Sequence, residues 1–275
     1  MTPPTDQPTL LPAAFAPGFT RVFGWWVRRM FRADFFAVRL ARENSSLLAD
    51  LANHPAPVIG VSNHCAWWDP LVFVLLQRRF MPDRLGTGPV EAEQWRRFGF
   101  MKKLGLFGID PHDPRAAPLM VEHVLERFRD NPRANFWITP QAQFVDPRQK
   151  ITIRPGVSMV AAAACDAGLD IRCVSIAIEY VFWVDRRPEL LIRLQPVGLD
   201  PATHPSTTTC HRAFTRAMRE NQATLASLSI AREPAAFETL VGGDHGRVNA
   251  AYDFWQRIRG RSGGIEARRF TESRP

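Results

Sequence analysis

The chain has 275 residues, of which 45% are hydrophobic and 23% are charged, and its formal net charge is +8. This composition excludes wholesale disorder and allows one large domain with a substantial core. The basic residues are almost all arginine, which pairs well with phosphate and other anions, although a biased codon pool would give the same excess. We find no nucleic-acid-binding motif, and the arginines are interleaved with Trp and Phe. An anionic membrane surface is therefore the expected partner, and nucleic acid is not.

The cysteines and the N-terminus bear on the cellular compartment. Cys65, Cys165, Cys173 and Cys210 show no CxxC spacing, which predicts neither a disulfide framework nor a metal site and fits a reducing cytosol. The first residues lack a signal-peptide pattern, and no apolar run reaches the ~18 residues that would span a bilayer. We therefore expect a cytoplasmic protein that associates peripherally with the inner face of the membrane.

The N-terminal segment predicts an arm followed by an amphipathic helix. Residues 1–18 are rich in proline and are expected to form a loosely packed arm. Residues 19–43 predict a helix, because apolar residues recur at spacings of three and four and arginines follow one stripe. The apolar face consists of Phe19, Phe23, Trp26 and Met30, and the stripe of Arg21, Arg28, Arg32 and Arg39. This pattern is typical of an interfacial membrane helix and also of an ordinary surface helix.

Alternating strand and helix patterns follow. Strands are predicted at 56–62, 134–139, 171–180 and 189–197, and helices at 71–80, 89–104, 116–130 and 155–167. Residues 205–259 predict helix with breaks at Pro234 and Gly242. The expected fold is α/β, with a mixed, largely parallel sheet flanked by helices, an N-terminal amphipathic helix and a helical C-terminal extension. The expected division is an arm and helix at 1–54, a core at 55–200 and the extension at 201–275.

The segment from Asn63 to Pro70 carries the clearest chemical pattern. It places His64 just after a predicted strand and Asp69 at the N-cap of the next helix, with Pro70 at the first helical position. A separation of five residues lets the loop fold the carboxylate back onto the imidazole. One ring nitrogen is then held, and the other is free to act as a base. Without a protein nucleophile in this pattern, the substrate must supply one. A structural histidine capped by a carboxylate is the alternative.

The pattern Asn-His-x4-Asp followed by Pro-Leu resembles the first motif of the glycerolipid acyltransferase family, which includes lysophosphatidate acyltransferases. Residues 105–110 resemble the second motif, 137–143 lie where the third falls, and 173–178 resemble the fourth. The resemblance covers about residues 55–200. It implies an O-acyltransferase in which His64 deprotonates a lipid hydroxyl and Asp69 orients His64. Acyl-CoA or acyl-carrier protein would be the co-substrate, and the resemblance implies neither a cofactor nor a metal.

The resemblance also implies substrate-binding residues and walls for an acyl tunnel. The expected substrate-binding residues are Asn63, Trp67, Trp68, Asp110, Pro140, Gln141, Ala142, Gln143 and Arg148. Backbone N–H groups near residues 140–143 are expected to stabilise the oxyanion. The apolar helix from Leu71 and the Ala-rich helix at 155–167 would wall an acyl tunnel, although core packing explains both equally well.

The sequence departs from the family pattern where the acceptor phosphate is bound. Pro111 and Phe144 stand where the family has arginine, and neither replaces a bidentate Arg–phosphate pair. We therefore expect a non-phosphate or glycosylated lipid acceptor, such as a carotenoid glycoside, with Gln141 and Gln143 contacting its hydroxyls. Two alternatives stay open. The first is a lysophosphatidate acyltransferase of phospholipid synthesis in which Arg115, Arg148 or Arg154 binds the phosphate, and the second is a catalytically weak lipid-binding paralogue.

Overall fold

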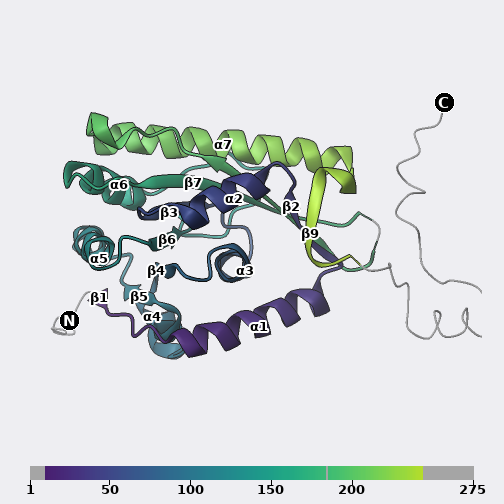
Figure 1. Cartoon of the computed structure of the whole chain (residues 1–275), viewed down its shortest axis with the longest axis horizontal. Coiled ribbons are helices and arrows are strands. Elements are labelled where there is room, and N and C mark those ends of the chain that lie inside the picture. Colours follow the sequence, from purple (N-terminus) through teal and green to yellow (C-terminus); the bar gives the residue numbers. More distant parts are fainter. Residues whose placement is uncertain (1–9, 184, 244–275) are drawn as a thin grey trace, which may run out of the picture.

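A computed structural model describes residues 10–183 and 185–243 of the chain (Figure 1). The strands are β1 (Leu10–Leu11), β2 (Ala37–Ala41), β3 (Val58–Ser62), β4 (Leu85–Glu91), β5 (Leu106–Ile109), β6 (Ala134–Ile138), β7 (Arg172–Val181), β8 (Glu189–Pro196) and β9 (Phe237–Gly242). The helices are α1 (Pro17–Asp34), α2 (Asn44–Asn53), α3 (Asp69–Phe80), α4 (Ala92–Arg97), α5 (Ala116–Asp130), α6 (Gly156–Asp166) and α7 (Thr207–Ala231). Short 3-10 helices are η1 (Met101–Leu104), η2 (Pro201–Thr203) and η3 (Pro234–Ala236).

The described strands form one mixed sheet in the order β1-β5-β4-β6-β3-β7-β8-β2-β9. Strand β3 pairs in parallel with β6 on one side and with β7 on the other. Strands β4 and β5 continue the parallel part, whereas β1, β8 and β9 each join the sheet by an antiparallel pairing. The predicted fold class is confirmed. Because β3 to β7 run in the same direction, the loops that follow them meet at one edge of the sheet, where ligands bind in open α/β sheets.

Each face of the sheet carries its own hydrophobic core. Helices α5, α6 and α7 cover one face, where Phe107, Phe136 and Phe214 are fully buried. Helices α1, α2 and α3 cover the other face around Phe31, Leu48 and Leu76 (Figure 1). The alanines of α6 belong to the first of these cores, where small side chains allow the helix to lie close to the sheet and to α7. No helix in the described ranges is both long and apolar enough to cross a bilayer.

The N-terminal prediction was wrong at both ends of its helix. Residues 10–16 are not a loose arm, because Leu10 and Leu11 pair with the edge of β5 and the N–H of Ala14 donates to Lys102. The helix ends at Asp34 instead of residue 43, and the chain enters β2. Arg39 does not belong to the arginine stripe. It is buried in β2, forms an ion pair with Glu189 and donates to Thr239 at 3.1 Å.

Two further predicted helices were too long. Residues 89–104 contain the end of β4, the short helix α4 and η1, so Pro89 lies in a strand. Within the predicted helical stretch at 205–259, α7 covers Thr207–Ala231, but residues 237–242 form β9, which pairs with β2. The remainder of that stretch from residue 244, like residues 1–9 of the arm, lies outside the described residues. Helix α2 and the neighbouring strands β4 and β5 were not predicted.

Candidate active site

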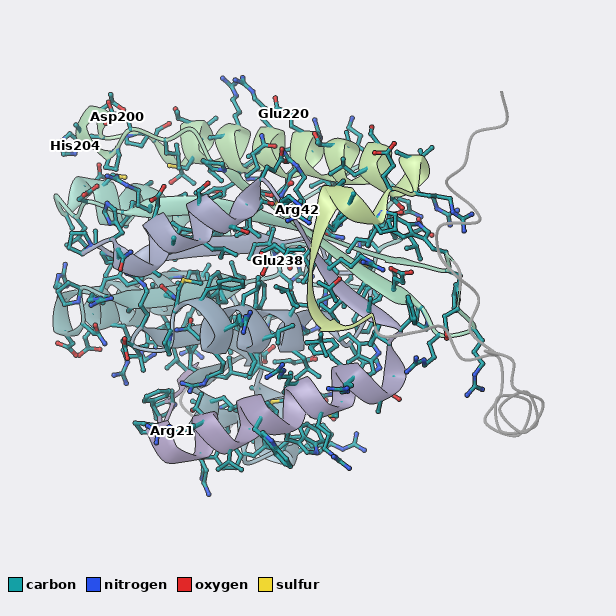
Figure 2. All side chains as sticks on the ribbon, turned by 45° about the vertical axis from the view of Figure 1, so that its right-hand side comes forward. Arg21, Arg42, Asp200, His204, Glu220 and Glu238 are labelled. Atoms are coloured by element: carbon teal, nitrogen blue, oxygen red, sulfur yellow. The ribbon has the colours of Figure 1, made fainter. Side chains whose placement is uncertain are left out.

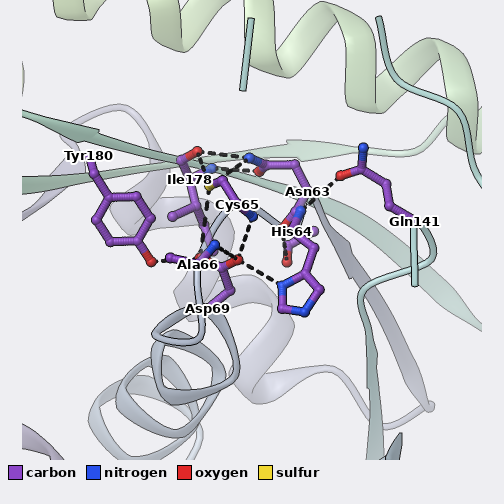
Figure 3. Close-up of polar contacts among 9 residues, drawn as sticks. Asn63, His64, Cys65, Ala66, Asp69, Gln141, Ile178 and Tyr180 are labelled. Carbon is purple, nitrogen blue, oxygen red and sulfur yellow. Dashed lines mark hydrogen bonds and ion pairs between the residues drawn. The ribbon is translucent and has the colours of Figure 1, made fainter. Parts of the chain in front are cut away.

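His64 and Asp69 face each other across the loop that joins β3 to α3 (Figure 3). His64 Nδ1 lies 2.8 Å from Asp69 Oδ2. An ionised carboxylate can only accept, so Nδ1 carries the proton and the lone pair of Nε2 points away from Asp69. The predicted pairing of imidazole and carboxylate is confirmed as geometry. The imidazole keeps 16% of its side-chain surface exposed, so a substrate can reach it.

The carboxylate of Asp69 also closes the loop on itself. Asp69 is the first residue of α3, and Trp68 is its N-cap, so the prediction that Asp69 caps the helix was wrong. The side chain instead turns back, and Oδ2 accepts from the backbone N–H groups of Cys65 at 2.7 Å and Ala66 at 2.9 Å. Asp69 is fully buried, and these two donors fix the oxygen that holds His64. Pro70 is therefore the second residue of the helix, one position later than predicted.

Tyr180 completes the surroundings of Asp69 and was not predicted. Its hydroxyl donates to Asp69 Oδ1 at 2.6 Å from the end of β7, 111 residues further along the chain (Figure 3). Asn63 binds the same strand. Its side-chain amide donates to the carbonyl of Ile178 and accepts from the N–H of Ile178, both at 2.8 Å. Since Asn63 is buried and its amide serves the backbone, it holds the loop against β7 and does not present a polar group to a substrate.

The loop after β6 covers His64 from the other side. Gln141 Oε1 accepts from the backbone N–H of His64 at 2.8 Å, and the N–H of Val145 donates to the His64 carbonyl at 2.7 Å. Between them Ala142 has a φ of 53°, in the left-handed region that favours glycine. This is the position at which the resembled family has glycine. The ring of Phe144 lies against the imidazole of His64, with ring centroids 4.6 Å apart.

The remaining residues predicted to bind substrate do not all gather at the loop. Pro140 accepts from the N–H of Arg154 through its carbonyl, and Gln143 is exposed. Arg148 is 87% exposed and forms an ion pair of 2.7 Å with Asp146, which lowers the pKa of Asp146 and raises that of Arg148. Asp110 follows β5, three strands from β3 and thus roughly 14 Å away across the sheet. Its carboxylate accepts from the N–H of His112, so Asp110 stabilises the turn that follows β5.

An apolar cavity of about 720 Å³ opens beside this loop, between α1, α3, η1 and the sheet. Its walls near the loop include Trp67, Pro70 and Thr139. Its apolar lining further in comes from Phe23, Leu71, Phe73, Val74, Leu85, Val90, Phe100, Leu104 and Leu106. This volume is within the ~300–1,000 Å³ of small-molecule sites. Trp67 and Pro70, which flank the dyad in sequence, line the cavity, whereas His64 and Asp69 are not among its lining residues.

Of the two tryptophans, one lines the cavity and the other packs in the core. The same holds for the two helices predicted to wall an acyl tunnel. Trp67 is 57% exposed and lines the cavity. Trp68 packs against the rings of Phe31 and Phe35, with centroids 5.4 Å and 5.0 Å away. Likewise, α3 provides a wall of the cavity, whereas the Ala-rich α6 lies in the core of the opposite face.

Cys65 adjoins His64 but is unsuited to act as a nucleophile. Burial, and next the charge of Asp69, raise the pKa of its thiol far above the ordinary value. The thiolate, which is the reactive form, is therefore suppressed. Within the described part of the chain, no three His, Cys, Asp or Glu side chains are grouped so that they would hold a metal ion.

Comparisons with known proteins find a similar arrangement of elements among solved structures. No family model matches the chain, and no curated protein matches it. The chain is similar to the crystal structure of the 1-acyl-sn-glycerophosphate (LPA) acyltransferase PlsC from Thermotoga maritima. The identity is 15% and the TM-score 0.49, over 78% of this chain and 79% of that chain.

Proposed function

We propose that the protein is an O-acyltransferase that moves a fatty acyl group from a thioester to the hydroxyl of a lipid. The observation that carries this proposal is the His64–Asp69 pair of 2.8 Å beside an apolar cavity of about 720 Å³. The pair supplies an oriented general base, and the cavity has the size and lining for a fatty chain. Acyl-CoA or acyl-carrier protein is the proposed donor.

The proposed reaction needs no covalent enzyme intermediate. His64 Nε2 takes the proton of the acceptor hydroxyl as its oxygen attacks the thioester carbonyl carbon, and Asp69 stabilises the resulting imidazolium. The C–S bond of the tetrahedral intermediate then breaks, and the departing sulfur takes the proton from His64. The products are an ester and a free thiol, and His64 returns to its starting state. The backbone N–H groups of Gln141 and Gln143 are the proposed donors to the oxyanion, because Pro140 has no N–H and that of Ala142 donates to the carbonyl of Thr139 at 3.1 Å.

For the acceptor, we propose a lipid alcohol without phosphate, of which a glycosylated lipid such as a carotenoid glycoside is one example. Phe144 supports this proposal, because its apolar ring lies 4.6 Å from the ring of His64, where a phosphate-binding arginine would otherwise approach the base. Gln141 is already engaged by the backbone of His64. Gln143 is exposed on the same loop and has both a donor and an acceptor for a hydroxyl.

A second candidate is acylation of lysophosphatidate, and Arg148 is the observation in its favour. Arg148 is on the same loop and is 87% exposed, and its partner is the neighbouring Asp146. An exposed ion pair of this kind contributes little to stability because water screens it, so a phosphate would compete for the guanidinium.

A transfer assay with variants of the dyad tests the proposed reaction. Labelled acyl-CoA is supplied with lysophosphatidate in one arm and with a glycosylated lipid alcohol in the other. We expect His64→Ala to lower kcat by about 10²–10⁴-fold, because it removes the general base. His112→Ala changes an exposed histidine in the turn after β5 and should leave kcat unchanged.

The outcomes of this assay separate the candidates. Turnover of the glycosylated acceptor that depends on His64 supports the proposal. Brisk turnover of lysophosphatidate alone favours the second candidate. Lipid binding with no transfer to either acceptor points to a catalytically weak paralogue, and transfer that survives His64→Ala contradicts the proposed mechanism.

We also propose that α1 docks the protein on an anionic membrane surface. Val22 and Trp25 are each 65% exposed on this helix, and Arg21, Arg28 and Arg29 are exposed beside them. Aromatic side chains next to arginines fit the boundary between headgroups and acyl chains. Helix α1 also walls the cavity, so docking through α1 would bring the cavity close to the lipid phase.

A further inference from the structure

The two oxygens of Asp69 have different partners. Oδ2 accepts from His64 Nδ1 and from the N–H groups of Cys65 and Ala66, all within the β3–α3 loop. Oδ1 accepts from the hydroxyl of Tyr180 at 2.6 Å, and the thiol of Cys65 lies farther away at 3.9 Å. Tyr180 therefore makes the short contact that distinguishes one carboxylate oxygen from the other.

The fold holds the Tyr180 hydroxyl firmly in this place. Strand β7 runs parallel to β3 with Ser62 opposite Ile176, so Tyr180 reaches past the end of β3 to the loop. Its ring lies 5.9 Å from that of Phe35. Burial, and next the charge of Asp69, raise the pKa of Tyr180 far above that of a free phenol. The hydroxyl therefore stays protonated and keeps its role as donor.

We propose that Tyr180 is a positioning residue for the dyad: its O–H anchors Asp69 Oδ1 so that Oδ2 stays aligned with His64 Nδ1 throughout the reaction. This inference rests on the proposed acyl transfer. Without the anchor, only the N–H groups of Cys65 and Ala66 and the imidazole hold the carboxylate in place, all through Oδ2, and its alignment with the imidazole is looser. The O–H also draws negative charge from the carboxylate, which limits how strongly Asp69 stabilises the imidazolium.

Several other titratable groups surround the dyad and Tyr180. Cys65 belongs to the loop itself, Glu179 precedes Tyr180 on β7, and Asp146 lies in the loop after β6; the charges of Glu179 and Asp146 both act on Cys65. Arg148 acts on Glu179 and is paired with Asp146. Glu179 accepts from Ser229 of α7 at 3.2 Å, on the opposite side of β7 from Asp69.

The test removes this single O–H and compares it with a matched hydroxyl of α7 that also donates to a side chain of β7. Tyr180→Phe keeps the ring and deletes the donor to Asp69. Ser229→Ala deletes a hydroxyl that also donates to a carboxylate of β7, one residue away. For Tyr180→Phe we expect kcat to fall about tenfold, because a hydrogen bond to a charged group is lost, with KM for both substrates unchanged. Ser229→Ala should leave both constants unchanged.

A second measurement needs no acyl transfer. Diethyl pyrocarbonate modifies neutral imidazole, and peptide mass spectrometry reports the modification of His64 as a function of pH. In Tyr180→Phe the carboxylate regains negative charge and stabilises the imidazolium, so the pH at which half of His64 reacts should rise. Incorporation of 3-fluorotyrosine makes the phenol a stronger donor and should lower that pH. The chain has two tyrosines, so Tyr252→Phe confines the label to Tyr180.

Opposite shifts for the two changes, absent from Ser229→Ala, support the positioning role, since a merely structural role would not produce them. An unchanged kcat together with an unchanged midpoint in Tyr180→Phe overturns it. If the unmodified protein transfers no acyl group but the midpoints still shift, Tyr180 positions the dyad and the proposed function fails. If transfer depends on His64 and neither midpoint shifts, the function stands and the inference about Tyr180 fails.

Discussion

At the scale of single residues, the contact between Gly60 and Trp137 shows how tightly β3 is packed beneath the site. The two residues are opposite each other in the parallel pairing of β3 and β6. A Cβ on Gly60 would lie 2.2 Å from atoms of the Trp137 ring. Trp137 in turn donates through its indole N–H to Gln77 at 3.0 Å and lines the cavity. The absence of a side chain at residue 60 is therefore what lets the indole lie between β3 and α3.

We predict that Gly60→Ala lowers the free energy of unfolding by about 1–3 kcal/mol, because the rigid indole must move out of a packed site. Urea denaturation measures the change. Gly198→Ala is the matched control, since no atom lies within 4 Å of its new methyl group, and it should change the stability by less than about 0.5 kcal/mol. Equal stabilities for the two variants would show that the ring has room to shift.

The sequence predicts part of the site because that part is local. His64 and Asp69 are five residues apart, so the end of one strand and the start of one helix are enough to bring them together. Tyr180 is 111 residues from Asp69, and its place depends on the register of β7 against β3, which no spacing in the sequence reveals. The roles of Asn63 and Trp68 follow from what they pack against, and this also requires the assembled sheet.

At the scale of elements, the predictions failed where two elements are joined without a loop signal. The arginine stripe of the N-terminal helix continues in sequence to Arg39, but an isolated pattern cannot show that this arginine pairs with Glu189 inside the sheet. Strand β2 was therefore assigned to the helix. The long, regular α5 and the strands β7 and β8 were predicted well, because their periodicity persists over several turns or alternations.

Helix α5 packs against the sheet through His123, one of whose ring nitrogens is left without a hydrogen bond in the part of the chain that the structure describes. Its ring packs edge-on against Phe107 of β5, with centroids 4.6 Å apart, and its Nε2 is buried without a hydrogen-bond partner among the described residues. Burial, and next the charge of Arg127, lower the pKa of His123. The unfolded chain therefore binds a proton more readily than the folded chain below about pH 6.5, so this residue costs stability as the pH falls through that value.

We predict that His123→Phe raises the free energy of unfolding by about 1 kcal/mol at neutral pH, because an unsatisfied buried nitrogen is removed. The gain should be larger at pH 5.5, where the histidine of the folded state resists protonation. Urea denaturation at the two pH values measures both effects. The same change at the exposed His112 should not alter the pH dependence, and an equal gain at both pH values would contradict the role of burial.

At the scale of the whole molecule, α1 and α7 cover opposite faces of the sheet, and their exposed surfaces differ. Figure 2 shows Arg21 on α1 and Glu220 on α7, on either side of the sheet. Each helix has a large exposed apolar side chain: Trp25 is 65% exposed on α1 and Ile230 is 80% exposed on α7. The two helices therefore allow a comparison of an exposed aromatic side chain with an exposed aliphatic one.

We predict that Trp25→Ala lowers the partition constant for vesicles containing anionic lipid about tenfold, because an interfacial aromatic anchor is lost. Ile230→Ala should leave it unchanged. Sedimentation with vesicles measures the partitioning, and added salt should weaken it through the arginines of α1. Equal loss in the two variants would show that the protein binds lipid without using α1.

The dyad and the cavity share the start of α3, but β3 and β7 hold the reacting groups, whereas α1 and η1 line the part of the cavity away from them. Helix α1 meets α3 where Gly24 approaches the aliphatic part of Arg78. A chimera that exchanges residues 10–34 should therefore change which fatty chains are accepted while the bond-making step stays the same. In such a protein, substitutions in α1 can change the preferred acyl chain, and the catalytic rate is preserved. A family could therefore diversify its substrates without losing turnover.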